Sequence, residues 1–78
     1  MSNIEKYNHV FSEVMSASLD NLADLKFKES ENWDSVGHMT LIAALEDAFD
    51  IFLEVDDMMS ITSYDKGKEV LSKYGVDI

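Results

Sequence analysis

Ser35 and His38 are the residues of this sequence whose types and spacing could do chemistry. They stand three positions apart, directly after Asp34, and in a helix this spacing puts both side chains on nearly the same face. A serine beside a histidine can act as a nucleophile, but such catalysis also needs an oriented base and an oxyanion hole in a cleft that excludes water. A helix end in a chain of 78 residues is not expected to supply that cleft, and no third residue is evident to orient the imidazole. We therefore do not expect an enzyme, and we expect His38 to be solvated or to lie near a group linked to Ser35.

Ser35 is better suited to carry an anionic group than to attack a substrate. Asp34 is a good N-cap, so Ser35 would be the first helical residue and its hydroxyl would point away from the core. The first-turn N–H groups have no helical partners and the helix dipole is positive there, so both would favour a phosphate ester on this hydroxyl. Local physics alone still favours a simpler interpretation, in which Asp-Ser only starts a helix.

The acidic residues and the methionines suggest two other kinds of site, a calcium-binding loop and a methionine-rich binding groove. A calcium loop read from Asp47 has Phe49 at its third position and Phe52 at its sixth, where an oxygen ligand and a glycine are required, so this reading fails. The five methionines are too few and too scattered to form an adaptable binding groove, and we expect Met39 to lie in the core. No metal site is therefore predicted.

The spacing of apolar residues predicts the elements that must position Ser35. A first helix is expected from about Asn3 to Ser18, with His9 on its surface, followed by a loop of about 14 residues that Trp33 fastens to the helices. The second helix follows the Asp34 cap. Its wide apolar face is made by Val36, Met39, Leu41, Ile42, Leu45, Ala48 and Phe49.

The C-terminal third predicts one short helical turn and one longer helix. Residues 51–55 form a β-branched and aromatic run, but a lone strand has no partner, so we expect a loop. Asp56 or Asp57 could cap the short turn. Thr62 and Asp65 have the spacing of a capping box, which would open a last helix that ends before Gly75.

Length and composition agree with an all-α fold in one domain over residues 1–78: a four-helix bundle of three longer helices and one short one, with a long first loop. Leu, Ile, Val and Phe make up 22 of the 78 residues, enough for one modest core. The sequence has no cysteine, and its first 25 residues hold no apolar run long enough for a signal peptide or a membrane span. We therefore expect a cytoplasmic protein.

Almost all of the net charge of −10 lies in the middle of the chain. The segment Glu29–Tyr64 holds nine acidic residues and no lysine or arginine, so it supplies −9 of this charge. Such a field repels nucleic acid and anionic membranes and would attract a basic protein surface. Taken alone, the charge fits a role in solubility equally well.

Three stretches of the chain resemble the acyl carrier protein family, also called phosphopantetheine-binding or peptidyl carrier domains. They are Trp33-Asp34-Ser35-Val36, Leu45-Glu46-Asp47-Ala48-Phe49 with Ile51 near its end, and Asp56-Asp57 followed by Ile61-Thr62-Ser63. The resemblance covers nearly the whole chain, and the chain length, the helix order and the pI of about 4.2 agree with it. Together these features favour a modified serine over a simple helix start.

The resemblance implies that Ser35 accepts covalent 4′-phosphopantetheine from a phosphopantetheinyl transferase, with Asp34 near the magnesium and phosphate during that encounter. The thiol of this arm would then carry acyl or aminoacyl groups as thioesters. The implied protein is a monomeric carrier, not itself an enzyme, that does not bind nucleic acid or insert into membranes. Its further partners would be an acyl- or amino-acid-activating ligase and a downstream acyltransferase or synthase.

Two departures from the family pattern limit what the resemblance implies, and the second bears on the choice of pathway. Val36 stands where the family usually has leucine, and Gly37 and Thr40 stand where fatty-acid carriers place acids, while His38 could add a positive charge. The expected partner surface is therefore formed by Val36, Met39, Glu46, Asp47 and Asp56. This pattern favours a stand-alone carrier of a specialised pathway, such as polyketide, nonribosomal peptide or surface-saccharide acylation. The alternative is an acidic helical protein-interaction module without a prosthetic group.

Overall fold

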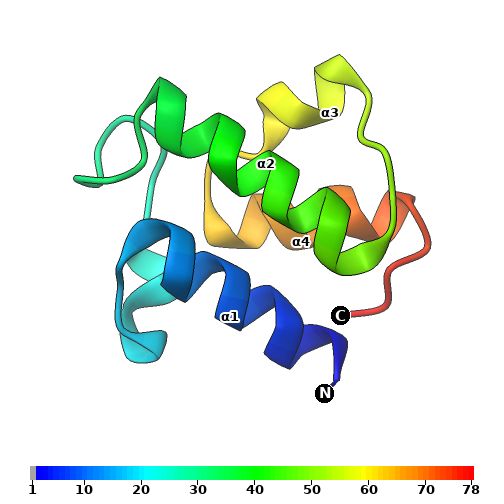
Figure 1. Cartoon of the computed structure of the whole chain (residues 1–78), viewed down its shortest axis with the longest axis horizontal. Coiled ribbons are helices and arrows are strands. Elements are labelled where there is room, and N and C mark those ends of the chain that lie inside the picture. Colours follow the sequence, from blue (N-terminus) through cyan, green and yellow to red (C-terminus); the bar gives the residue numbers. More distant parts are fainter. Residues whose placement is uncertain (1) are drawn as a thin grey trace.

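The regular elements of the chain are all helical in a computed structural model, which describes residues 2–78 (Figure 1). The three longer helices are α1 (Asn3–Met15), α2 (Ser35–Phe49) and α4 (Tyr64–Lys73). Two shorter ones are the 3₁₀ helix η1 (Leu19–Asp24) and α3 (Val55–Ser60). The predicted all-α class is confirmed for these residues, since none of them forms a strand.

The first connection differs from the predicted loop because it contains η1. Ser16 adopts the left-handed conformation (φ 53°), which ends α1 at Met15, three residues before the predicted end. The Ser18 side chain then accepts a hydrogen bond from Asp20 N and caps η1, whose Leu22 is buried in the core. The connection is therefore partly helical and contributes to the core.

The caps of α3 and α4 also lie one to three residues from their predicted positions. Glu54 is the N-cap of α3, so Asp56 and Asp57 are not caps but lie in its first turn. Ser63, and not Thr62, caps α4 by accepting a hydrogen bond from Lys66 N at 3.2 Å. The predicted C-terminal glycine is confirmed: Gly75 has φ 83° and follows the last residues of α4.

The core is built around four aromatic side chains from different parts of the chain, Tyr7, Phe11, Trp33 and Tyr64. Their rings pack at tilted or edge-on angles with centroids 4.9–5.5 Å apart. The predicted role of Trp33 is confirmed, since it is fully buried against Phe11.

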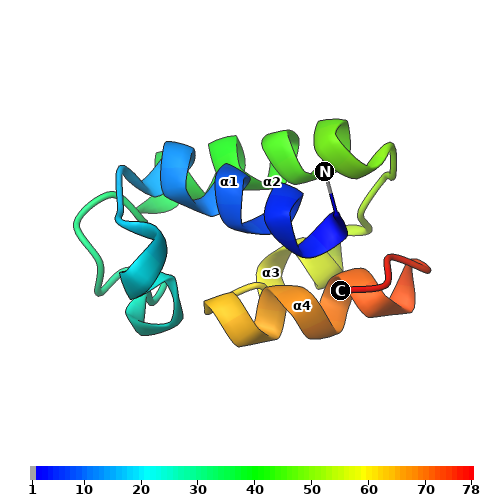
Figure 2. The same cartoon turned by 90° about the horizontal axis from the view of Figure 1, so that it is seen from below.

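The four α-helices of the described residues form two layers. Figures 1 and 2 show α1 and α2 side by side in one layer, with α3 and α4 in the other. Gly67 of α4 lies against α1, because a Cβ atom there would come within 2.1 Å of the Tyr7 hydroxyl. Within residues 2–78, no helix combines the length and apolar character needed to cross a membrane.

Candidate functional site

Ser35 is the first residue of α2, and Asp34 caps that helix as predicted. Asp34 Oδ1 accepts a hydrogen bond from Gly37 N at 2.8 Å, and the Asp34 carbonyl accepts one from His38 N at 2.8 Å. Ser35 is exposed, and its hydroxyl makes no hydrogen bond to any residue that the structure describes. The aspartate therefore organises the helix start and leaves the serine hydroxyl open to solvent.

Gly37 allows the turn before α2 to lie directly against the helix. A Cβ atom on Gly37 would lie 2.0 Å from the carbonyl oxygen of Asn32, far inside the contact distance. Asn32 is itself held, because its side-chain amide donates a hydrogen bond to the Met15 carbonyl at 2.9 Å. No side chain, acidic or otherwise, fits at position 37 unless this turn moves.

His38 lies in the core, so the prediction of a solvated or positively charged His38 is wrong. The residue is only 3% exposed. Trp33 Nε1–H donates a hydrogen bond to His38 Nδ1 at 3.0 Å, and His38 Nε2 lies 2.8 Å from the Met58 carbonyl oxygen. Nδ1 must therefore be an acceptor and Nε2 a donor, which is a neutral imidazole. We call these three linked residues the Trp33–His38–Met58 clasp.

The clasp joins three separate segments around the start of α2. Trp33 belongs to the preceding turn, His38 to α2 and Met58 to α3, and the Phe27 ring packs on the imidazole with centroids 4.7 Å apart. Sequence reasoning missed this role, although a signal was present. His38 precedes the buried Leu41, Ile42 and Leu45 by three, four and seven positions, the spacing of a core face.

The outer face of α2 carries apolar side chains beside Ser35. Val36 is 76% exposed and Met39 is 56% exposed, so the expectation that Met39 lies in the core is wrong. With Ser35, Thr40 and Ala43 they line an open depression along the helix. Ser35 therefore lies at one end of a mostly apolar strip on the surface.

The acidic residues predicted to contact partners differ in their surroundings. Glu46 is half-buried and its Oε2 accepts a hydrogen bond from Leu53 N at 2.8 Å, so it is less open to a partner than a residue of the expected partner surface should be. Asp47 and Asp56 are exposed. Glu46 thus stabilises the connection from α2 to α3, whereas Asp47 and Asp56 can meet a partner.

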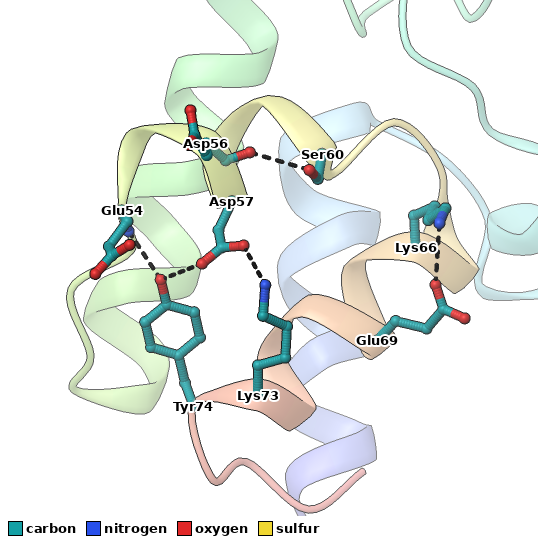
Figure 3. A network of polar contacts seen from close by, with 8 residues as sticks. All are labelled: Glu54, Asp56, Asp57, Ser60, Lys66, Glu69, Lys73 and Tyr74. Carbon is teal, nitrogen blue, oxygen red and sulfur yellow. Dashed lines mark hydrogen bonds and ion pairs between the residues drawn. The ribbon is translucent and has the colours of Figure 1, made fainter.

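Asp57 fastens α3 to the end of α4 (Figure 3). Its two carboxylate oxygens accept hydrogen bonds from Lys73 Nζ and from the Tyr74 hydroxyl, each at 2.6 Å, and Tyr74 in turn accepts one from Glu54 N at 2.9 Å. The hydrogen bonds from Lys73 and Tyr74 lower the pKa of Asp57, and the one to Asp57 raises the pKa of Lys73. Part of the acidic middle segment therefore has a structural role.

Comparison with known proteins adds no assignment: no family model, curated protein or solved structure matches this chain. Among residues 2–78, no group of three or more His, Cys, Asp or Glu side chains is arranged to hold a metal ion. The chemistry of the site must be inferred from Ser35 and the groups around it.

Proposed function

We propose that this protein is an acyl or aminoacyl carrier whose Ser35 bears 4′-phosphopantetheine, and that it is not itself an enzyme. The observation that carries the proposal is the placement of Ser35, an exposed serine with a free hydroxyl at the first position of α2 directly after a capping aspartate. We further propose that the helices form the four-helix bundle of the acyl carrier protein family, with α3 as its short helix.

The surroundings of Ser35 fit a phosphodiester. Ser35 is exposed, and the positive end of the α2 dipole favours negative charge within the first turn. Asp34 Oδ1 accepts the hydrogen bond from Gly37 N, which holds this carboxylate at the start of the helix. The open depression next to Ser35 leaves room for an enzyme to approach.

The modification step is a phosphoryl transfer from coenzyme A. Ser35 Oγ forms a bond to the phosphorus that carries pantetheine, and the bond from this phosphorus to adenosine 3′,5′-bisphosphate breaks. The hydroxyl proton passes to a base of the transferase. The attached group supplies a thiol, which the chain lacks because it contains no cysteine.

The proposed partners are a phosphopantetheinyl transferase, an acyl- or amino-acid-activating ligase and a downstream acyltransferase or synthase. Val36 and Met39 provide exposed apolar surface near Ser35, and Asp47 and Asp56 provide exposed negative charge. Gly37 and Thr40 leave the first half of α2 without acids, which favours a specialised pathway over general fatty-acid synthesis.

Intact mass tests the proposal. The chain is co-expressed with a broad-specificity phosphopantetheinyl transferase and compared with the chain expressed alone. An added mass of one phosphopantetheine is expected. An unchanged mass with several competent transferases would instead favour the alternative, an acidic helical interaction module that uses the exposed Val36 and Met39 without a prosthetic group.

A further inference from the structure

A group tethered to Ser35 can either pass between the helices or remain on the outer face of α2. The choice depends on what fills the space on the inner side of this residue. Any chain entering beside Ser35 would have to pass the turn at Asn32, the side chains of Trp33 and His38, or the contact of α2 with α3.

The way inward between α2 and α3 is blocked near Ser35, because the Trp33–His38–Met58 clasp links the two helices there. Trp33 and His38 are 0% and 3% exposed, and both imidazole nitrogens are used, one by the indole N–H and one by the Met58 carbonyl. A chain passing here would separate these groups. A separated indole N–H would be left buried without a partner, which is unfavourable.

The way inward past the turn before α2 is blocked as well, because the backbone of this turn lies directly against α2. The Asn32 carbonyl lies so near Gly37 that not even a Cβ atom fits between them, and Asn32 is bonded to the end of α1. The Phe27 ring also packs against the His38 ring, with centroids 4.7 Å apart. The inner side of Ser35 is therefore filled by neighbours that hold one another in place.

We infer that a group carried on Ser35 stays outside the helices, and that the cargo is a short or polar acyl or aminoacyl group. A long alkyl chain held outside would be exposed to water and would promote association. This inference rests on the proposed carrier function and adds to it the class of cargo. Trp33 and His38 act as specificity-determining residues, because they block the entry of a long chain between the helices.

A single-cysteine variant tests the inference without a transferase. Because the chain has no cysteine, Ser35→Cys introduces a unique thiol, which is labelled with a methyl or a dodecyl maleimide. Ser72→Cys, at an exposed serine of α4, is the matched control. The readouts are the NMR signals of the one tryptophan indole and of the core methyl groups of Leu41, Ile42 and Leu45.

We expect these core signals to be the same for the methyl and dodecyl labels at position 35. β-Cyclodextrin, which takes up free alkyl chains, should bind the dodecyl chain at position 35 as well as it does at position 72. Weaker binding at position 35 with unchanged core signals would place the chain against the apolar outer face of α2 and would overturn the assignment of a short or polar cargo. Core signals that move with chain length at position 35, but not at position 72, would overturn it. Failure of Ser35 to be modified by transferases would refute the carrier function and leave this result unaffected.

Discussion

Replacing His38 by leucine removes both hydrogen bonds of the Trp33–His38–Met58 clasp and keeps a buried side chain of similar size. The variant leaves Trp33 Nε1–H without its acceptor at a fully buried position. It also removes the donor to the Met58 carbonyl, which keeps a weaker backbone hydrogen bond from Ile61 N at 3.4 Å. The main cost is therefore the unpaired indole N–H.

The size of the effect follows from these two losses. A buried polar group left without its partner costs about 1–3 kcal/mol, and the lost bond to Met58 adds about 1 kcal/mol. Burial of the apolar leucine side chain offsets part of this cost, so we expect a loss of roughly 2–3 kcal/mol in the free energy of unfolding. A domain of this size has only about 4–12 kcal/mol in total. The thermal midpoint should fall by roughly 10–20 °C.

Urea unfolding at neutral pH measures this loss, and the other histidine supplies the control. His9 is exposed and pairs with the exposed Glu13, so His9→Leu should change stability by less than about 0.5 kcal/mol. The two variants would behave alike if both histidines were solvated. A loss below about 0.5 kcal/mol for His38→Leu would refute the clasp.

Three further predictions concern other parts of the structure. The pKa of Asp57 is lowered in the folded protein, so its stabilising effect is complete above the ordinary aspartate pKa of about 3.9 and is lost as the pH falls through the pKa of the folded state. The thermal midpoint should therefore fall on acidification, and it should fall less steeply in Asp57→Asn. Gly37→Ala should destabilise the protein because of the 2.0 Å approach to the Asn32 carbonyl, although glycine to alanine in an open helix gains about 1 kcal/mol. Changing both Asp47 and Asp56 to lysine should slow loading or transfer by the cognate partner at least about tenfold, a barrier change of about 1.4 kcal/mol, and weaken its salt dependence.

Each of these predictions has an outcome that would contradict it. An equally steep acid dependence in Asp57→Asn would contradict the pKa argument. A more stable Gly37→Ala in urea would show that the turn yields easily. For the lysine variants, the control is Asp20→Lys with Asp24→Lys on η1, which makes the same change of charge at exposed positions away from α2. Equal slowing in both double variants would mean that only net charge matters, and circular dichroism would confirm that each remains folded.

The parts of the fold that local patterns govern were predicted from the sequence. The apolar spacing of α1 and α2, the Asp34 cap and the Gly75 terminus each depend on residues within a turn or two of one another. The position of Ser35 at the start of α2 follows from the same cap, so the place of the proposed attachment residue in the fold could be predicted from the sequence.

The parts that were missed depend on contacts between distant segments. Ser63 replaces Thr62 as the cap of α4, and the Thr62 carbonyl accepts a hydrogen bond from Phe27 N, a residue of the first connection. His38 has the spacing of a core residue, but its acceptor and donor roles are set by Trp33 and by the Met58 carbonyl, 20 residues away. A polar residue on an apolar face can be judged only when its partners are known.

The most direct test of the central claim is the intact mass of three proteins after incubation with coenzyme A and a broad-specificity phosphopantetheinyl transferase. They are the parent chain, Ser35→Ala and Ser72→Ala, the last replacing another exposed serine outside α2. Ser35→Ala should change stability by less than about 0.5 kcal/mol, because the Asp34 cap remains. We expect one phosphopantetheine on the parent and on Ser72→Ala, and none on Ser35→Ala. Modification of Ser35→Ala, or none on the parent, would contradict the assignment.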